Sequence, residues 1–195
     1  MKVQRNGVKA RMKAVRYTPV LLAIFICSSG RSATKDPRIA ELFGAKLSIL
    51  KNPTKVEAVR VSSMIWHENG NRHDDAPLGR FAGYPIQSQG VILDSKLTAA
   101  VSTALLDSKT YTWCPPNHGC GHLCGFSPGV ALRIWGQPSD KPVELLVCFK
   151  CNDLAIVQDG SEKYLTQDFS DGRAKLLRLM KEIFLADPVI QGLKP

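Results

Sequence analysis

The chain has 195 residues, of which 44% are hydrophobic and 22% are charged, and these fractions exclude an intrinsically disordered protein. Its net charge of +9 would suit a nucleic-acid partner, but much of the basic excess precedes residue 17, and no acidic residue occurs before Asp36. Without residues 1–30 the net charge is only about +3, so we expect no nucleic-acid binding.

The first 30 residues have the three parts of a secretory signal peptide. A basic segment ends at Arg16, an apolar run follows over Val20–Cys27, and the small residues Ser28–Gly30 come next. This run is far shorter than the roughly 20 residues that cross a bilayer as a helix. We therefore predict a signal peptide over residues 1–30 and one globular domain over residues 31–195, periplasmic or secreted.

Two alternatives remain open at this end of the chain. A lipid on Cys27 would make the protein a membrane-anchored lipoprotein, although Ile26 stands where lipoprotein signals usually carry Gly, Ala or Ser. Translation could also start at Met12 rather than Met1, because the basic segment is long. Apart from such a lipid, we expect only a transient membrane contact through the signal, and the sequence indicates no particular partner.

The next part of the chain alternates short predicted elements with polar segments. Residues 68–80 are rich in Asn, Asp, Gly and His and predict a surface loop. We assign His73 in this loop, and His67 just before it, to solvent rather than to a metal. Helix 95–106 carries Leu97, Val101 and Leu105 on one face. The full set in this region is a helix at 36–44, strands at 46–50 and 56–62 around an Asn52-Pro53 turn, a strand at 90–93 and the helix at 95–106.

The second half predicts a central hairpin and an amphipathic helix. Apolar residues alternate through 130–135 and 143–149, and Gly, Pro and Asp between them favour a turn centred near Ser139. A further strand is predicted at 154–157. Leu176, Leu177, Met180, Ile183 and Phe184 follow helical spacing, with Ser170 or Asp171 as the cap and Asp187-Pro188 as the stop. The fold class is therefore α+β, a small antiparallel sheet packed by helices on one face.

Five cysteines of the predicted mature chain form the one chemically suggestive cluster. They are Cys114, Cys120, Cys124, Cys148 and Cys151. In an exported protein such residues are usually joined in disulfides, and an odd number leaves one thiol over. Two bridges and a spare thiol are the first interpretation.

A zinc site is the second interpretation. Cys120 and Cys124 form one closely spaced pair and Cys148 and Cys151 another, with His118 and His122 as alternative donors. The predicted hairpin sets Cys148 opposite Val130 and Cys151 opposite Ser127. However, residues three apart on a regular strand face opposite sides, so a bulge or strand end near Lys150 is required.

A thiol–disulfide oxidoreductase that uses Cys148 and Cys151 is the third interpretation. A reactive thiolate usually lies at a helix N-terminus, whereas turn and strand residues follow Cys151. We find no Ser-His-Asp order, paired carboxylates or phosphate-binding Gly-rich loop. The expected function is thus a non-catalytic binding or structural domain without a cofactor, and zinc binding is the main alternative.

Several runs resemble a family of uncharacterised bacterial proteins that are often exported. They are 49–53 with 56–58, 83–86, 124–133, 148–151 and 187–191, including the pattern C-x-F-x-P-G-V-A-L-R followed by C-F-x-C. The resemblance implies a shared fold and no particular reaction. It also implies a three-cysteine core in which Cys124 is bridged to Cys148 or Cys151, which disfavours the four-donor zinc site.

Overall fold

The computed structural model describes residues 36–62, 76–113, 125–137, 139–158 and 164–195, which belong to one compact unit. The predicted signal peptide, the loop histidines and Cys114, His118, Cys120, His122 and Cys124 lie outside the described residues. Within the described ranges, no helix is both long and apolar enough to cross a membrane.

The first helices extend further than the sequence predicts. Asp36 caps α1 (Pro37–Phe43) by accepting a hydrogen bond from the Arg38 amide, as its Pro and Gly signals indicate. A 3₁₀ turn then leads into α2 (Leu47–Lys51), so the strand predicted at 46–50 is wrong. Leu47 and Leu50, three residues apart, contact the core from one helical face. The helix ends before Pro53, because a residue that precedes proline avoids helical angles.

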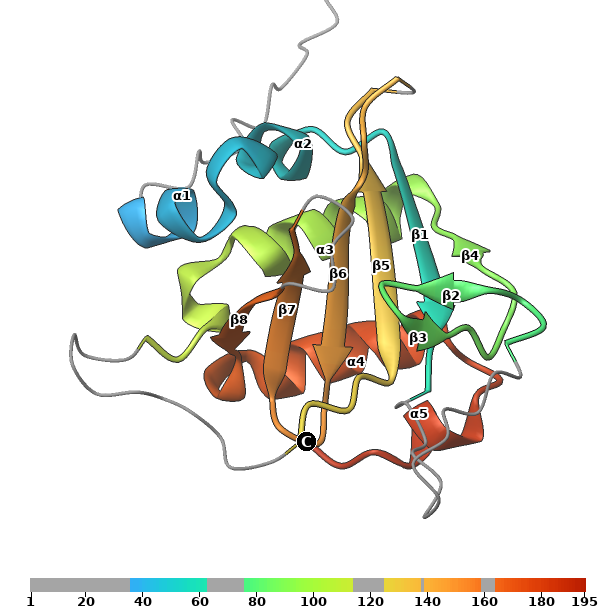
Figure 1. Ribbon diagram of the computed structural model, residues 1–195. Helices are drawn as coiled ribbons and strands as arrows, with labels where there is room; N and C mark the ends of the chain where they lie inside the picture. The colour runs from blue at the N-terminus through green and yellow to red at the C-terminus, as the bar shows by residue number, and fades with distance from the viewer. Residues whose placement is uncertain (1–35, 63–75, 114–124, 138, 159–163) are drawn as a thin grey trace, which may run out of the picture. The chain divides into compact units, whose positions relative to one another are not determined.

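Six antiparallel strands form the main sheet, and the α+β prediction is confirmed (Figure 1). The strands lie in the order β4-β1-β5-β6-β7-β8. Their bounds are β1 Lys55–Arg60, β4 Val91–Ile92, β5 Val130–Trp135, β6 Val143–Cys148, β7 Asp153–Val157 and β8 Tyr164–Asp168. The strands expected near 56–62, 90–93, 130–135, 143–149 and 154–157 are all present, whereas β8 was not predicted.

The central hairpin has a register one residue away from the predicted one. Val130 pairs with Val147 and Ile134 with Val143, so the position opposite Cys148 falls at Gly129 instead of Val130. The connecting turn is closed by Asp140, whose carboxylate accepts from the Gln137 amide at 2.8 Å. Cross-strand partners share one face of a sheet, so the observed register places Val130, Leu132 and Ile134 on the same face as Val143, Leu145 and Val147, in the larger core.

The two faces of the sheet bury different partners. Figure 1 shows α3 (Ser95–Leu106) and α4 (Arg173–Ile183) crossing one face, where Val56, Leu132 and Leu145 join the larger core. The other face carries a smaller cluster under the two-stranded sheet β2 (Arg80–Phe81) and β3 (Tyr84–Pro85), which was not predicted. Helices on one face of an antiparallel sheet are the expected arrangement.

Near the C-terminus, the residues that cap the helices differ from the predicted ones. The apolar stripe of α4 is buried as expected, but Ser170 and Asp171 lie in a 3₁₀ turn, and Gly172 precedes the first helical residue. Asp187 does not stop a helix. It caps a new one, α5 (Pro188–Gly192), by accepting from the Ile190 amide at 2.9 Å.

Candidate functional site

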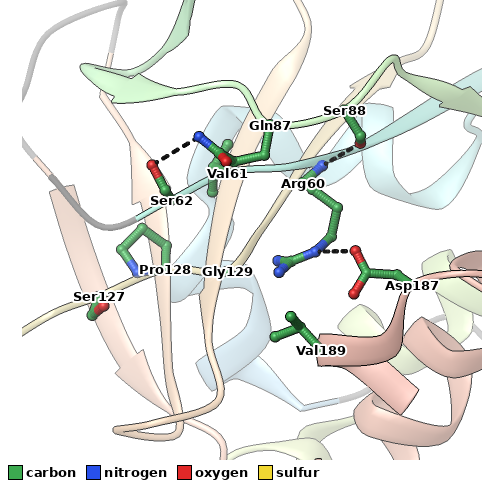
Figure 2. Close-up of a pocket in the computed structure, with 10 residues that line it drawn as sticks. All are labelled: Arg60, Val61, Ser62, Gln87, Ser88, Ser127, Pro128, Gly129, Asp187 and Val189. Atoms are coloured by element: carbon green, nitrogen blue, oxygen red, sulfur yellow. Dashed lines mark hydrogen bonds and ion pairs between the residues drawn. The ribbon is translucent and has the colours of Figure 1, made fainter. Parts of the chain in front are cut away.

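Two features lie at the same end of the sheet, where β1 and β6 end. The first is the loop between β6 and β7, which carries Cys148 and Cys151. The second is a solvent-open cavity of about 400 Å³ between the end of β1 and α5 (Figure 2). Residues 125–129 belong to both, because Gly125 contacts the cysteine loop and residues 127–129 line the cavity.

The β6–β7 loop brings the two cysteine sulfurs together. Cys148 is fully buried and has a free thiol. Its Sγ lies 3.3 Å from the Sγ of Cys151 and accepts a hydrogen bond from the Cys151 amide at 3.4 Å. Strand β6 ends at Cys148 and a turn follows, so the two side chains need not face opposite sides as they would on a continuous strand.

Cys151 is disulfide-bonded, and its partner lies outside the described residues. The Cys151 Sγ is 3.5 Å from the main-chain carbonyl oxygen of Gly125, the residue that follows Cys124. The predicted pairing of Cys124 with this loop falls on an undescribed residue and stays a prediction. In the described ranges, no group of three or more His, Cys, Asp or Glu side chains could hold a metal ion.

Arg173 fixes the shape of the cysteine loop from the start of α4. Its guanidinium donates to the carbonyl oxygen of Phe149 and to the side-chain oxygen of Asn152. Asn152 has a positive φ of 59°, which asparagine tolerates better than most residues. The residues after Cys151 form a turn and then β7, as the sequence predicts, so the chain does not continue from Cys151 into a helix whose N-terminus could activate its sulfur.

Four separate segments build the cavity. They are the end of β1 with Ser62, the Gln87–Ser88 segment after β3, residues 127–129 before β5, and Asp187 with Val189 at α5. Main-chain hydrogen bonds hold three of these together: the Gln87 amide donates to Arg60 at 2.8 Å, and the Val61 amide donates to Gly129 at 3.2 Å. Three of the four wall segments are therefore extensions of the sheet.

An ion pair forms the charged part of the cavity. The Arg60 Nε donates to the Asp187 Oδ2 at 2.7 Å, and these side chains are only 11% and 23% exposed. Burial by itself raises the pKa of Asp187, but hydrogen bonds from the Ile190 amide and from Arg60 outweigh it, so the pKa lies below its ordinary value of 3.8. The carboxylate stays ionised at neutral pH.

Sequence reasoning missed both members of this pair. Arg60 follows the apolar residues of β1 and has the same parity as Val56 and Ala58, which face the helices. A basic residue in phase with buried positions is a signal that could have been noticed. The sequence pattern predicts Asp187 only as part of a helix stop.

Comparison with models of protein families, with curated proteins and with solved structures finds no match for this chain. The family resemblance therefore stays a prediction, and the site must be interpreted from its own geometry.

Proposed function

We propose that this chain is an exported binding domain without a catalytic step of its own, in which a disulfide-bonded cysteine cluster stabilises the end of the sheet that carries the cavity. The preformed cavity is the observation that carries the proposal. Its volume of about 400 Å³ is within the range of small-molecule sites, and three of its four wall segments are tied together by main-chain hydrogen bonds at the end of the sheet. The signal-like N-terminus supports export.

The proposed role of the cysteines rests on the path of residues 125–129. The Gly125 carbonyl lies beside Cys151, and four residues later the Gly129 amide donates to Val147 at 3.1 Å. A bridge from Cys124 to Cys151 would tie the start of this segment to the β6–β7 loop. Such a bridge would restrict the wall formed by residues 127–129, which supports a structural role for the disulfide.

Two measurements on protein from the native host test the proposal. We expect an intact mass that corresponds to a mature chain starting near Ser29 to Arg31 in the extracytoplasmic fraction. Retained Met1 or Met12 on cytoplasmic protein would contradict export. We also expect that a library of small metabolites yields ligands that shift the amide resonances of the cavity residues and are recovered unchanged. Conversion of such a ligand at a rate that depends on the protein would contradict the binding-domain proposal.

Thiol–disulfide exchange is a second candidate function, favoured by the 3.3 Å separation between the free Cys148 sulfur and the disulfide-bonded Cys151 sulfur. Attack by the Cys148 thiolate on the Cys151 sulfur would form a Cys148–Cys151 bond and break the existing one. The former partner would leave as a thiolate and take up the proton lost by Cys148. Release of one glutathione from glutathione disulfide, as the protein forms a mixed disulfide with the other, would support this candidate if Cys148→Ser abolishes it, and unchanged release by that variant would exclude it.

A zinc function is less well supported. A sulfur in a disulfide is not a thiolate, and only the thiolate is a metal ligand, so the state of Cys151 disfavours it as a donor. The other proposed donors, apart from Cys148, lie outside the described residues. Elemental analysis of purified protein, together with a free-thiol count, tests zinc directly.

A further inference from the structure

The guanidinium of Arg60 has unused hydrogen-bonding capacity inside the cavity. Its Nε donates to Asp187, but its Nη1 is buried and has no acceptor among the residues that the structure describes. A guanidinium carries five N–H groups, and a buried donor without an acceptor costs about 1–3 kcal/mol. Figure 2 shows this group between Gly129 and Val189, within the ring of lining residues. An acceptor from outside the chain would remove the cost.

Asp187 cannot supply that acceptor in its present position. Its Oδ1 accepts from the Ile190 amide as the cap of α5, and its Oδ2 accepts from the Arg60 Nε. The helix therefore fixes the carboxylate so that Arg60 receives one oxygen instead of the two of a bidentate pair. The remaining edge of the guanidinium is left for another oxygen ligand.

Gly129 lets this edge of the guanidinium approach the main chain closely. A Cβ added at Gly129 would lie 3.1 Å from the Arg60 Nη1, which is its one neighbour within 4 Å. The main chain of Gly129 is already engaged, since its amide donates to Val147 and its carbonyl accepts from Val61. The absent side chain thus lets the Arg60 Nη1 lie closer to this main chain than a Cβ would normally allow, next to a backbone that the sheet holds in place.

The surrounding groups favour a carboxylate over a polyanion. Hydroxyl groups of Ser62, Ser88 and Ser127 line the cavity and can donate to an anion. The positive charge of Arg60 is already balanced by Asp187, so the cavity offers no net positive charge to hold a doubly charged phosphate. Val189 is 61% exposed and offers an apolar contact.

We infer that the cavity binds the carboxylate group of a small organic acid, with Arg60 as the donor that recognises it. This inference rests on the proposed binding function and specifies its ligand class.

The test titrates the full mature chain with acetate and propionate at constant ionic strength and pH 7, and follows its amide resonances. We expect saturable shifts centred on Arg60, Gly129 and Asp187, with a dissociation constant in the millimolar range, on the order of 1–10 mM, as so few ligand atoms allow. Because of its apolar methylene near Val189, propionate should bind at least as tightly as acetate. Inorganic phosphate should bind more weakly than either.

Two variants and two matched controls identify the recognition group. Arg60→Gln should weaken acetate binding by about tenfold or more, since a charge-assisted hydrogen bond is lost. Gly129→Ala should weaken it similarly without removing a charge. Gly125→Ala, where an added Cβ meets nothing within 4 Å, and Arg133→Gln, whose ion pairs with Glu57 and Glu144 lie away from the cavity, should leave it unchanged. If Arg60→Gln fails to fold, acetate binding by Gly129→Ala still tests the inference.

The outcomes separate this inference from the proposed function. Shifts at the cavity with glycerol but not with carboxylates would overturn the carboxylate inference and leave the binding domain in place. Tighter binding of phosphate, or equal binding of acetate by Gly129→Ala and the parent chain, would also overturn the inference. Protein-dependent conversion of a bound acid would instead contradict the non-catalytic function while leaving the recognition by Arg60 intact.

Discussion

Replacing Asp187 with alanine removes two interactions at once, the cap of α5 and the partner of Arg60. Loss of a helix cap costs about 1 kcal/mol. Loss of one member of a fully buried ion pair costs about 3–5 kcal/mol, whereas exposed pairs contribute about 0–1 kcal/mol. Arg60 and Asp187 are 11% and 23% exposed, so we take about 2 kcal/mol for the pair. We therefore expect Asp187→Ala to lower the free energy of unfolding by about 3 kcal/mol.

Thermal unfolding followed by circular dichroism measures this loss. For a domain of this size, about 3 kcal/mol corresponds to a fall in Tm of roughly 6–12 °C. Asp187→Asn keeps a side chain that caps well and loses only the charge, so its Tm should fall by roughly 4–8 °C. Asp107→Asn is the matched control, because Asp107 also caps a turn and pairs with Lys175 at 2.8 Å, but both of these side chains are more than a third exposed. It should change the stability by less than about 1 kcal/mol.

The stability that Asp187 contributes should also depend on pH, in a direction set by its pKa. The pKa of Asp187 is lowered in the folded state, so its contribution is complete above the ordinary value of 3.8 and is lost as the pH falls through the lower folded value. The difference in stability between the parent chain and Asp187→Asn should stay constant from pH 7 to about pH 4 and shrink below that. Equal Tm values for the parent chain and both variants, or a difference that does not shrink as the pH falls below about 4, would refute the reasoning.

Three further outcomes follow from single contacts. A Cβ on Gly172 would lie 2.5 Å from the Thr110 carbonyl oxygen and 2.6 Å from the Thr110 Cα. Gly172→Ala should therefore lower the free energy of unfolding, measured in urea, by about 1–3 kcal/mol. Gly192→Ala, whose added Cβ meets nothing within 4 Å, should stay within about 0.5 kcal/mol of the parent chain. The buried Cys148 thiol should react with a thiol reagent only after unfolding, and reaction within the mixing time on native protein would contradict its burial. Burial raises the pKa of Tyr111 well above 10, so its phenol should ionise only as the protein unfolds in alkali. Tyr111→Phe loses the buried hydrogen bond to the Leu105 carbonyl oxygen, and thermal unfolding should show a free energy of unfolding lower by about 1–2 kcal/mol.

Much of the secondary structure could be predicted because its signals are local. The cap at Asp36, the apolar face of α3 and the alternation in β5 and β6 each report which side of an element is buried. Such patterns depend only on the repeat of a helix or strand. The α+β class followed from their order along the chain.

The candidate site depends on contacts that no local pattern encodes. Arg60 and Asp187 are 127 positions apart, and they meet because the connection after α4 returns to the end of β1. The register of the central hairpin is set by how its turn closes, and a shift of one residue there decides which residues of β5 lie opposite those of β6. The sequence by itself determined the elements and their buried faces through periodicity. Only the tertiary structure decided which distant side chains share a cavity, because chain topology and strand register bring them together.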